Sequence, residues 1–545
     1  MVKNFLSLLS TRQTSILSGA VVLMVTVFAS KFLGLVRDRL LAQFFAPDQL
    51  AVFLAAFRLP DLIFQLLIFG AISVAFIPVF TDYIHKKGEK EAFAFASDIL
   101  NMVLVFFTII TIIIFFLAGP ITNLIVPGFT QQQKELTTAL TQVILLGQII
   151  LVIGSFFTGI CQSYQRFVVP ALSSVFYNVG IIFGILFLVP YWGIFGPAYG
   201  VIIGASLYVL VQIPLVSSLG FRHILRLNFQ SSGIREVTSM MSIRTIGIAV
   251  EQINETVGLI LATLITTSSV TFLTFAQHLQ TVPIGLFGAT LAQAALPVLS
   301  REQTKGEGDS FKITLLTTMH QILFLCLPAT AILIVLRIPA VRLVFGASQF
   351  NWEATVLTGK TVAFLALGLA AQSVVLLLVR AFYALKDTRT PVIVSIVTVV
   401  LNVGLSYYFV VISHMEVWSL GLAYAVSANL SVLMLIYFLN KRVGGFDRLD
   451  LFMPAFKMIL AAVVAAVALY VPIKSLDQLV FDTTKTINLV LLTGIASLFG
   501  LAVYFVMVYF LKVKELETFG NIIKKVYHLQ FQLKSKEIID ETGLI

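Results

Sequence analysis

Residues 31–39 read Lys-Phe-Leu-Gly-Leu-Val-Arg-Asp-Arg and place four charged side chains in a strongly apolar stretch. Apolar runs flank them at residues 16–30 and 40–45. A helix over 16–45 is long enough to cross a bilayer. An ionisable group inside such a helix costs at least about 2.5–3.5 kcal/mol on insertion scales, so it marks a functional site by default.

The length of this helix decides which charges lie in the membrane. If the span ends at Val36, only Lys31 is inside it, and the next three charges reach the interface. If the helix continues to Phe45, Lys31 and Asp38 share one face at 100° per residue, with Arg37 and Arg39 on either side of it. The longer helix would line a wet, cationic cavity.

Composition sets the broad class. The chain has 545 residues, of which 59% are hydrophobic and 11% charged, with a mean hydropathy of +0.99. These values predict an all-α polytopic membrane protein without a soluble domain. Cys161 and Cys326 lie in separate apolar runs, where we expect buried thiols and neither a disulfide nor a metal site. No cofactor is expected.

Apolar runs predict fourteen transmembrane helices. They cover residues 16–45, 51–84, 92–118, 137–160, 170–190, 196–217, 236–265, 270–299, 312–336, 355–381, 391–412, 418–440, 452–473 and 486–511. With the N-terminus in the cytoplasm, 26 of the 36 lysines and arginines fall on the cytoplasmic side, six outside and four within the first two helices. Both termini are therefore predicted to be cytoplasmic.

An internal repeat with a spacing of about 220 residues divides the chain. Pro78 and Pro297 lie within similar motifs at this spacing, and Gly128 recurs at Gly346. A second pair of motifs with the same spacing is Tyr164…Pro170…Asn178-Val179-Gly180 and Tyr383…Pro391…Asn402-Val403-Gly404. The repeat predicts two pseudo-symmetric six-helix lobes, 1–220 and 221–440. A terminal helix pair, 441–511, and an amphipathic cytoplasmic tail, 512–545, would follow.

Intramembrane polar residues gather in the leading helix pair of each predicted lobe. Arg58 and Asp61 share a face of the second helix, Glu251 and Glu255 are one turn apart on the seventh, and His278 is on the eighth. Each has a structural alternative. Arg58 and Asp61 could pair with each other, the glutamates could pair with Arg244 instead of taking up a proton or cation, and His278 could only pack.

Sequence motifs for enzymatic chemistry are missing. Gly359-Lys360-Thr361 resembles the end of a phosphate-binding loop, but Ala354 stands where its first glycine belongs. We therefore predict a transporter that is not an enzyme and is not driven by ATP through such a loop. An ion gradient or the membrane potential is the natural alternative.

Several motifs together resemble the MurJ (MviN) family of bacterial flippases for lipid-linked cell-wall precursors. They are Ser30–Asp38, Phe57-Arg58-Leu59-Pro60-Asp61-Leu62, Ala75-Phe76-Ile77-Pro78 and Phe382–Pro391. The resemblance implies the fold of the multidrug/oligosaccharidyl-lipid/polysaccharide exporters, with a central cationic cavity that alternates between the faces of the inner membrane. The implied substrate is lipid II, an undecaprenyl-pyrophosphate that carries a disaccharide-pentapeptide for peptidoglycan synthesis.

The family's basic and acidic residues carry over in part, and imply substrate binding by Lys31, Arg37, Asp38 and Arg58. Phe64 and His278 stand where the family commonly has arginine, and Phe69 where an acidic residue is frequent. Glu251 and Glu255 replace neutral residues. With His278, they are candidates for coupling transport to an ion.

Three transport functions stay open at this point: a lipid II flippase, a flippase for another lipid-linked glycan, and a cation-coupled drug exporter. The terminal helix pair and the basic residues Lys31, Arg37 and Arg58 argue against the exporter. A membrane glycosyltransferase would need an exposed acidic site and a large outer loop, which we do not find. The expected location is the bacterial cytoplasmic (inner) membrane.

Overall fold

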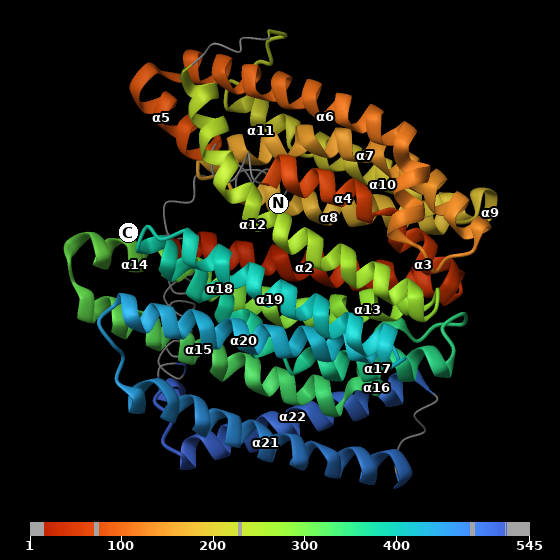
Figure 1. The fold of residues 1–545 in the computed structure, drawn as a ribbon, viewed down its shortest axis with the longest axis vertical. Coiled ribbons are helices and arrows are strands. Elements are labelled where there is room, and N and C mark those ends of the chain that lie inside the picture. Colours follow the sequence, from red (N-terminus) through yellow and green to blue (C-terminus); the bar gives the residue numbers. More distant parts are fainter. Residues whose placement is uncertain (1–15, 70–75, 227–231, 480–484, 518, 520–545) are drawn as a thin grey trace, which may run out of the picture. The chain divides into compact units, whose positions relative to one another are not determined.

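The computed structural model describes residues 16–69, 76–226, 232–479, 485–517 and 519. Within these ranges every regular element is a helix (Figure 1). The predicted all-α membrane fold is confirmed. Most of the predicted tail, 512–545, lies outside the described residues.

The chain packs as two compact units. One comprises Met1–Leu286, Ala340–Gly368 and Arg389–Ser431, and the other Phe287–Pro339, Leu369–Thr388 and Val432–Ile545. The six-helix lobes inferred from the repeat stay a prediction, because this division by packing does not test them.

The helices of the first unit are α2 (Ile16–Phe44), α3 (Pro47–Ala56), α4 (Arg58–Phe64), η1 (Gln65–Phe69), α5 (Ile77–Lys87), α6 (Glu89–Ile125), α7 (Gln131–Ser163), α8 (Val168–Phe183), η3 (Gly184–Leu188), α9 (Val189–Trp192), α10 (Phe195–Leu210), α11 (Ile213–Ser218), α12 (Ser232–Ile265), α13 (Ser269–Pro283), α17 (Trp352–Ala366), α19 (Arg389–Tyr407) and η5 (Tyr408–Ile412). Within it, α2 packs on α8, and α12 packs on α19 and α6.

The second unit holds α14 (Thr290–Lys305), α15 (Gly308–Val335), α18 (Leu369–Ala384), α21 (Arg448–Leu479) and α22 (Thr486–Phe510). The elements η4 (Ile284–Ala289), α16 (Arg337–Phe345) and α20 (Trp418–Arg442) run across a boundary between the units. The terminal pair α21 and α22 run along each other (Figure 1). Tyr504 of α22 donates its hydroxyl to the Phe324 carbonyl of α15 at 3.0 Å, which ties the pair to this unit.

Two helices begin earlier than their apolar runs predict. The predicted helix 137–160 is Gln131–Ser163 in the structure, and Thr130 begins it with a capping box shared with Gln133. The predicted single helix 51–84 is wrong: its described residues form α3, α4, η1 and α5. The first of these begins at Pro47, since proline is favoured in the first turn.

Twelve of the described helical stretches are long and apolar enough to cross a membrane, or thirteen if the bent pair α17–α18 is one span. The helix α2 is not among them, so the total of fourteen stays a prediction. Both cysteines are free and buried, as predicted.

The repeat recurs in irregular features of the backbone. The π-helical turns η1 and η4 begin at Gln65 and Ile284, one repeat spacing apart, and η3 and η5 begin at Gly184 and Tyr408, only slightly farther apart. A π-helical turn carries one residue more than an α-helical turn and is rare. Two pairs of such turns at corresponding positions therefore support the repeat independently of the sequence motifs.

The end of the fourth helix of each repeat adds a third pair of positions. Gln165 and Lys386 correspond across the repeat, and both have a φ of 58°. In each case the next amide donates back into the helix at 2.9 Å, from Arg166 to the Cys161 carbonyl and from Asp387 to the Phe382 carbonyl. The two segments end their helices with the same left-handed cap.

Gly180 and Gly404 occupy corresponding repeat positions but have different neighbours. A Cβ atom added to Gly180 would collide with the backbone of Gly204 in α10, whereas one added to Gly404 would meet nothing within 4 Å. The close approach of α8 and α10 therefore requires glycine at position 180.

We expect Gly180→Ala to lower the free energy of unfolding by about 1–3 kcal/mol, the usual size of an overpacking cost. Gly404→Ala is the matched control and should be neutral or slightly stabilising. SDS-induced unfolding in mixed micelles measures both. Equal losses in the two variants would contradict this account of the α8–α10 contact.

Candidate functional site

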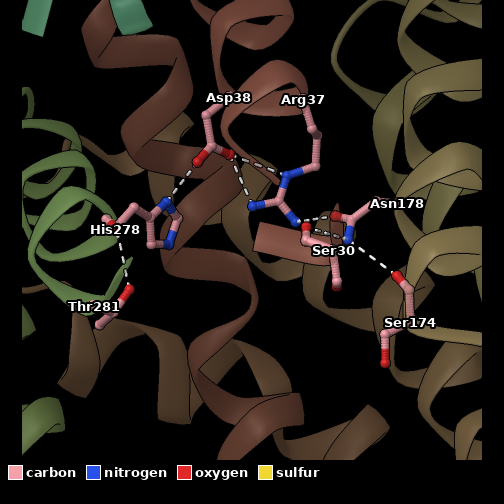
Figure 2. Close-up of polar contacts among 7 residues, drawn as sticks. All are labelled: Ser30, Arg37, Asp38, Ser174, Asn178, His278 and Thr281. Carbon is pink, nitrogen blue, oxygen red and sulfur yellow. Dashed lines mark hydrogen bonds and ion pairs between the residues drawn. The ribbon is translucent and has the colours of Figure 1, made fainter. Parts of the chain in front are cut away.

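Asp38 is a charged side chain buried inside α2, only 1% exposed. Its Oδ1 accepts from Nε and Nη2 of Arg37 at 3.0 and 2.8 Å, and its Oδ2 lies 2.6 Å from Nδ1 of His278 (Figure 2). A carboxylate so far from water is tolerated only when it is paired and hydrogen-bonded. Both of its oxygens have such a partner, one from its own helix and one from α13.

Asn178 of α8 completes this group, which we call the Asp38 cluster: Arg37, Asp38, Asn178 and His278. The Asn178 Oδ1 accepts from Nη1 of Arg37 at 3.3 Å. Its amide nitrogen donates to the carbonyls of Ser30 and Ser174 at 3.4 and 3.1 Å (Figure 2). The asparagine thus orients the guanidinium and joins α2 to α8.

The neighbouring arginine of α2 points away from this cluster. Arg39 donates from Nη1 to the Leu343 carbonyl at 2.7 Å. Arg37 and Arg39 therefore lie on either side of the Asp38 face, as the helical spacing predicts. Lys31 is exposed.

A second group, the Arg58 cluster, joins α4 to α12. It consists of Arg58, Gln252, Glu255 and Thr256. Nε of Arg58 donates to the Thr256 hydroxyl at 2.8 Å and Nη1 to the Glu255 carboxylate at 2.6 Å. Nη2 donates to the backbone and side-chain oxygens of Gln252 at 2.6 and 2.7 Å. The Arg58 side chain is 10% exposed and that of Glu255 is 50% exposed.

The proposed pairing of Arg58 with Asp61 does not occur. Oδ1 of Asp61 instead accepts from the Gln148 amide of α7 at 3.0 Å. The carboxylate that pairs with Arg58 is that of Glu255, on another helix, and it accepts from Nη1. Phe64, at a position where arginine was expected, packs edge-on against Phe107 of α6.

His278 lies in the Asp38 cluster and Glu255 in the Arg58 cluster, whereas Glu251 is exposed one turn away on α12. The side chains of Arg244 and Phe69 are outside the described part of the structure. Within the described residues, no group of three or more His, Cys, Asp or Glu could hold a metal ion.

Sequence reasoning missed Asn178, Gln252 and Thr256 as members of these clusters. Asn178 belongs to a repeated motif, whose spacing indicates the repeat but does not predict the contact with Arg37. Neutral polar residues in apolar helices were the available signal, because such groups need hydrogen-bond partners away from water. Their partners lie up to 198 residues away in the chain, beyond the reach of a helical-face argument.

The two clusters have the chemistry of an anion site. A guanidinium donates a rigid fork of N–H groups that suits carboxylate and phosphate alike. In this structure the Asp38 carboxylate accepts from two nitrogens of Arg37, whereas the Glu255 carboxylate accepts from one nitrogen of Arg58.

Comparison with known proteins gives a family and a fold. The family model described as lipid II flippase MurJ matches residues 40–491. A probable lipid II flippase MurJ of Haemophilus influenzae is 28% identical over 81% of this chain and 90% of its own length. The lipid II flippase MurJ of Burkholderia cenocepacia is 24% identical over 76% of this chain and 81% of its own.

Solved structures agree on the fold. A lipid II flippase MurJ in an inward closed conformation superposes with a TM-score of 0.73 at 22% identity, covering 89% of this chain and 99% of that one. An inward-facing multidrug resistance transporter of the MATE family has a TM-score of 0.66 at 14% identity, over 78% and 98%.

The Asp38 cluster predicts a specific loss of stability. Asp38→Asn keeps the shape of the side chain but removes the charge that Arg37 and His278 face. We expect the free energy of unfolding to fall by about 1.5–3 kcal/mol, the range for hydrogen bonds to charged groups. SDS-induced unfolding measures it.

Asp82→Asn is the matched control, because Asp82 pairs with Lys86 at 2.9 Å on an exposed helix face. Exposed pairs contribute little. If both variants unfold like the wild type, the Asp38 cluster does not stabilise the fold.

Proposed function

The chain belongs to the lipid II flippase MurJ family, and from this premise we propose that it translocates lipid II across the bacterial inner membrane for peptidoglycan synthesis. It is a multi-pass membrane transporter. The observation that carries the proposal is the presence of two arginines, Arg37 and Arg58, held by polar clusters within apolar helices of a chain that matches this family from residue 40 to residue 491.

The chemistry of the substrate explains these arginines. A pyrophosphate carries about two negative charges that must leave water on the way across the membrane. Guanidinium groups replace the lost hydration with charge-assisted, partly bidentate hydrogen bonds. We assign substrate binding to Lys31, Arg37 and Arg58, with Asp38 orienting Arg37. The polyprenyl chain stays in lipid, so that only the headgroup needs a polar path.

Transport proceeds by alternating access in this proposal, with both termini in the cytoplasm. The excess of lysine and arginine in the predicted cytoplasmic loops supports this orientation. Another lipid-linked glycan is the alternative substrate, since a pyrophosphate linkage would engage the same arginines. The likeness to MATE transporters is a likeness of fold.

The decisive experiment is complementation of a cell depleted of its own lipid II flippase. We expect the wild-type chain to restore growth, and Lys31→Ala and Arg37→Ala to fail. Loss of a hydrogen bond to a charged group, about 1.5–3 kcal/mol, corresponds to a roughly ten- to hundredfold slower flipping rate. Arg37→Lys should retain part of the activity, because the charge remains but the fork does not.

The exposed residue Lys31 gives the cleaner test, because Arg37 also stabilises Asp38. Lys90→Ala, at an exposed position in the first turn of α6, is the control and should grow like the wild type. Normal growth with both Lys31→Ala and Arg37→Ala would refute the assigned binding site. Failure of the wild type itself would refute lipid II as the substrate.

We also propose that His278, Glu251 and Glu255 couple transport to an ion gradient. Imidazole is the side chain whose charge changes near neutral pH, and His278 faces a carboxylate at 2.6 Å. Glu255 faces a guanidinium, and Glu251 is exposed one turn away. A proton or small cation could thus be taken up in one state and released in another.

In proteoliposomes, we expect imposed pH or sodium gradients to change the wild-type flipping rate. His278→Gln and Glu251→Gln/Glu255→Gln should lose this response, whereas His85→Gln, at an exposed position in α5, should keep it. A wild-type rate that ignores both gradients, or variants that respond like the wild type, would exclude coupling through these residues.

A further inference from the structure

The donor groups of Arg58 are committed to α12. Three of its nitrogens donate to four acceptor atoms, all contributed by Gln252, Glu255 and Thr256. These residues lie within little more than one helical turn. An incoming phosphate oxygen cannot take the place in front of Nη1 while the Glu255 carboxylate stands there at 2.6 Å.

The four acceptors differ in how freely they can leave. The Gln252 carbonyl belongs to the helix backbone, and the Gln252 side chain is buried. The Thr256 hydroxyl also donates to the same carbonyl at 2.7 Å, which fixes it. The Glu255 side chain is half-exposed, and it is the one anion of the cluster. Glu255 is therefore the acceptor that a competing anion can displace.

We propose that Glu255 is an internal stand-in for the substrate phosphate: it occupies Arg58 in the substrate-free state and leaves when the pyrophosphate binds. The inference rests on the proposed function, because it takes Arg58 as a substrate ligand. Carboxylate and phosphate offer a guanidinium equivalent oxygens, so one replaces the other without leaving the arginine unpaired in an apolar helix. Glu255 acts through Arg58 and is a positioning residue.

The exchange has a consequence for α12. Once displaced, Glu255 carries an uncompensated charge one turn from Glu251, and like charges at this spacing repel. The ion pair that ties α4 to α12 is lost in the same step. Substrate binding at Arg58 therefore loosens the contact between these helices, and return of the Glu255 carboxylate to Nη1 helps to expel the substrate.

In the Asp38 cluster, by contrast, the anion that pairs with the arginine is fixed in place. Asp38 is adjacent to its arginine in the chain, 1% exposed, and held on its other side by His278. If Asp38 moved away from Arg37, a buried charge would be left without its partner. Of the two arginines, Arg58 alone has a partner that is anionic, half-exposed and contributed by another helix.

A double-mutant cycle on the full-length protein in detergent tests the proposal. The probe is undecaprenyl pyrophosphate, and its dissociation constant is measured for the wild type, Glu255→Gln, Arg58→Gln and the double variant. We expect Glu255→Gln to bind about tenfold more tightly, which corresponds to a coupling of about 1.4 kcal/mol. In the Arg58→Gln background the same change should have no effect.

Flipping in proteoliposomes gives the second readout. Glu255→Gln should turn over more slowly than the wild type although it binds more tightly. In this variant no carboxylate competes with the substrate for Arg58, so the substrate is released more slowly. A merely structural role would weaken binding and flipping together. Glu416→Gln, which breaks an exposed pair with Lys360 at 3.2 Å, is the control and should bind and flip like the wild type.

Three results would overturn the inference: no gain or a loss of affinity in Glu255→Gln, a gain that persists without Arg58, or an equal gain from Glu251→Gln. The last would mean that general charge and not direct competition sets the affinity. A wild type that neither binds the probe nor restores growth would instead refute the proposed function, and the inference with it.

Discussion

The pairing of the Asp38 carboxylate governs the arrangement of the first helix. A nearly inaccessible anion in an apolar segment must be neutralised within hydrogen-bond distance, and Asp38 obtains this from Arg37 and His278. The requirement sets the rotation of α2, because its aspartate must face α13 while its arginine reaches Asn178 of α8. Elements distant in sequence are thereby fixed to α2 by polar contacts that only one orientation satisfies.

Two arginines of the same chemical type are thus prepared for different tasks. Arg37 is held by a carboxylate that cannot move and by an asparagine that is itself anchored to two backbone carbonyls. Arg58 is held by a half-exposed carboxylate. A fixed guanidinium can give a substrate a constant orientation. In the proposed mechanism, a guanidinium with an exchangeable partner responds to the arrival of the substrate.

The sequence predicted much of this arrangement because its main signals are local. A heavily apolar composition gives a polytopic helical fold, and helical spacing placed Arg37 and Arg39 on opposite sides of Asp38. The tertiary partners were beyond such arguments. Helical spacing offered Asp61, on the next turn of the same helix, as one alternative partner for Arg58, but the structure uses Glu255, 197 residues distant. Likewise, the family resemblance showed that His278 stands at a position where arginine is common. It could not show that His278 faces Asp38.

Two asparagine contacts one repeat spacing apart differ in charge. Asn178 and Asn402 correspond across the repeat, and each contacts the leading helix of its own half: Asn178 contacts Arg37, and Asn402 donates to Asn254 at 2.6 Å. Arg37 and Asn254 are themselves separated by nearly the repeat spacing. Each asparagine thus contacts a polar residue of another helix, but only the partner of Asn178 is charged. In the proposed mechanism, the arginines of α2 and α4 are the cationic pair toward which a pyrophosphate is drawn.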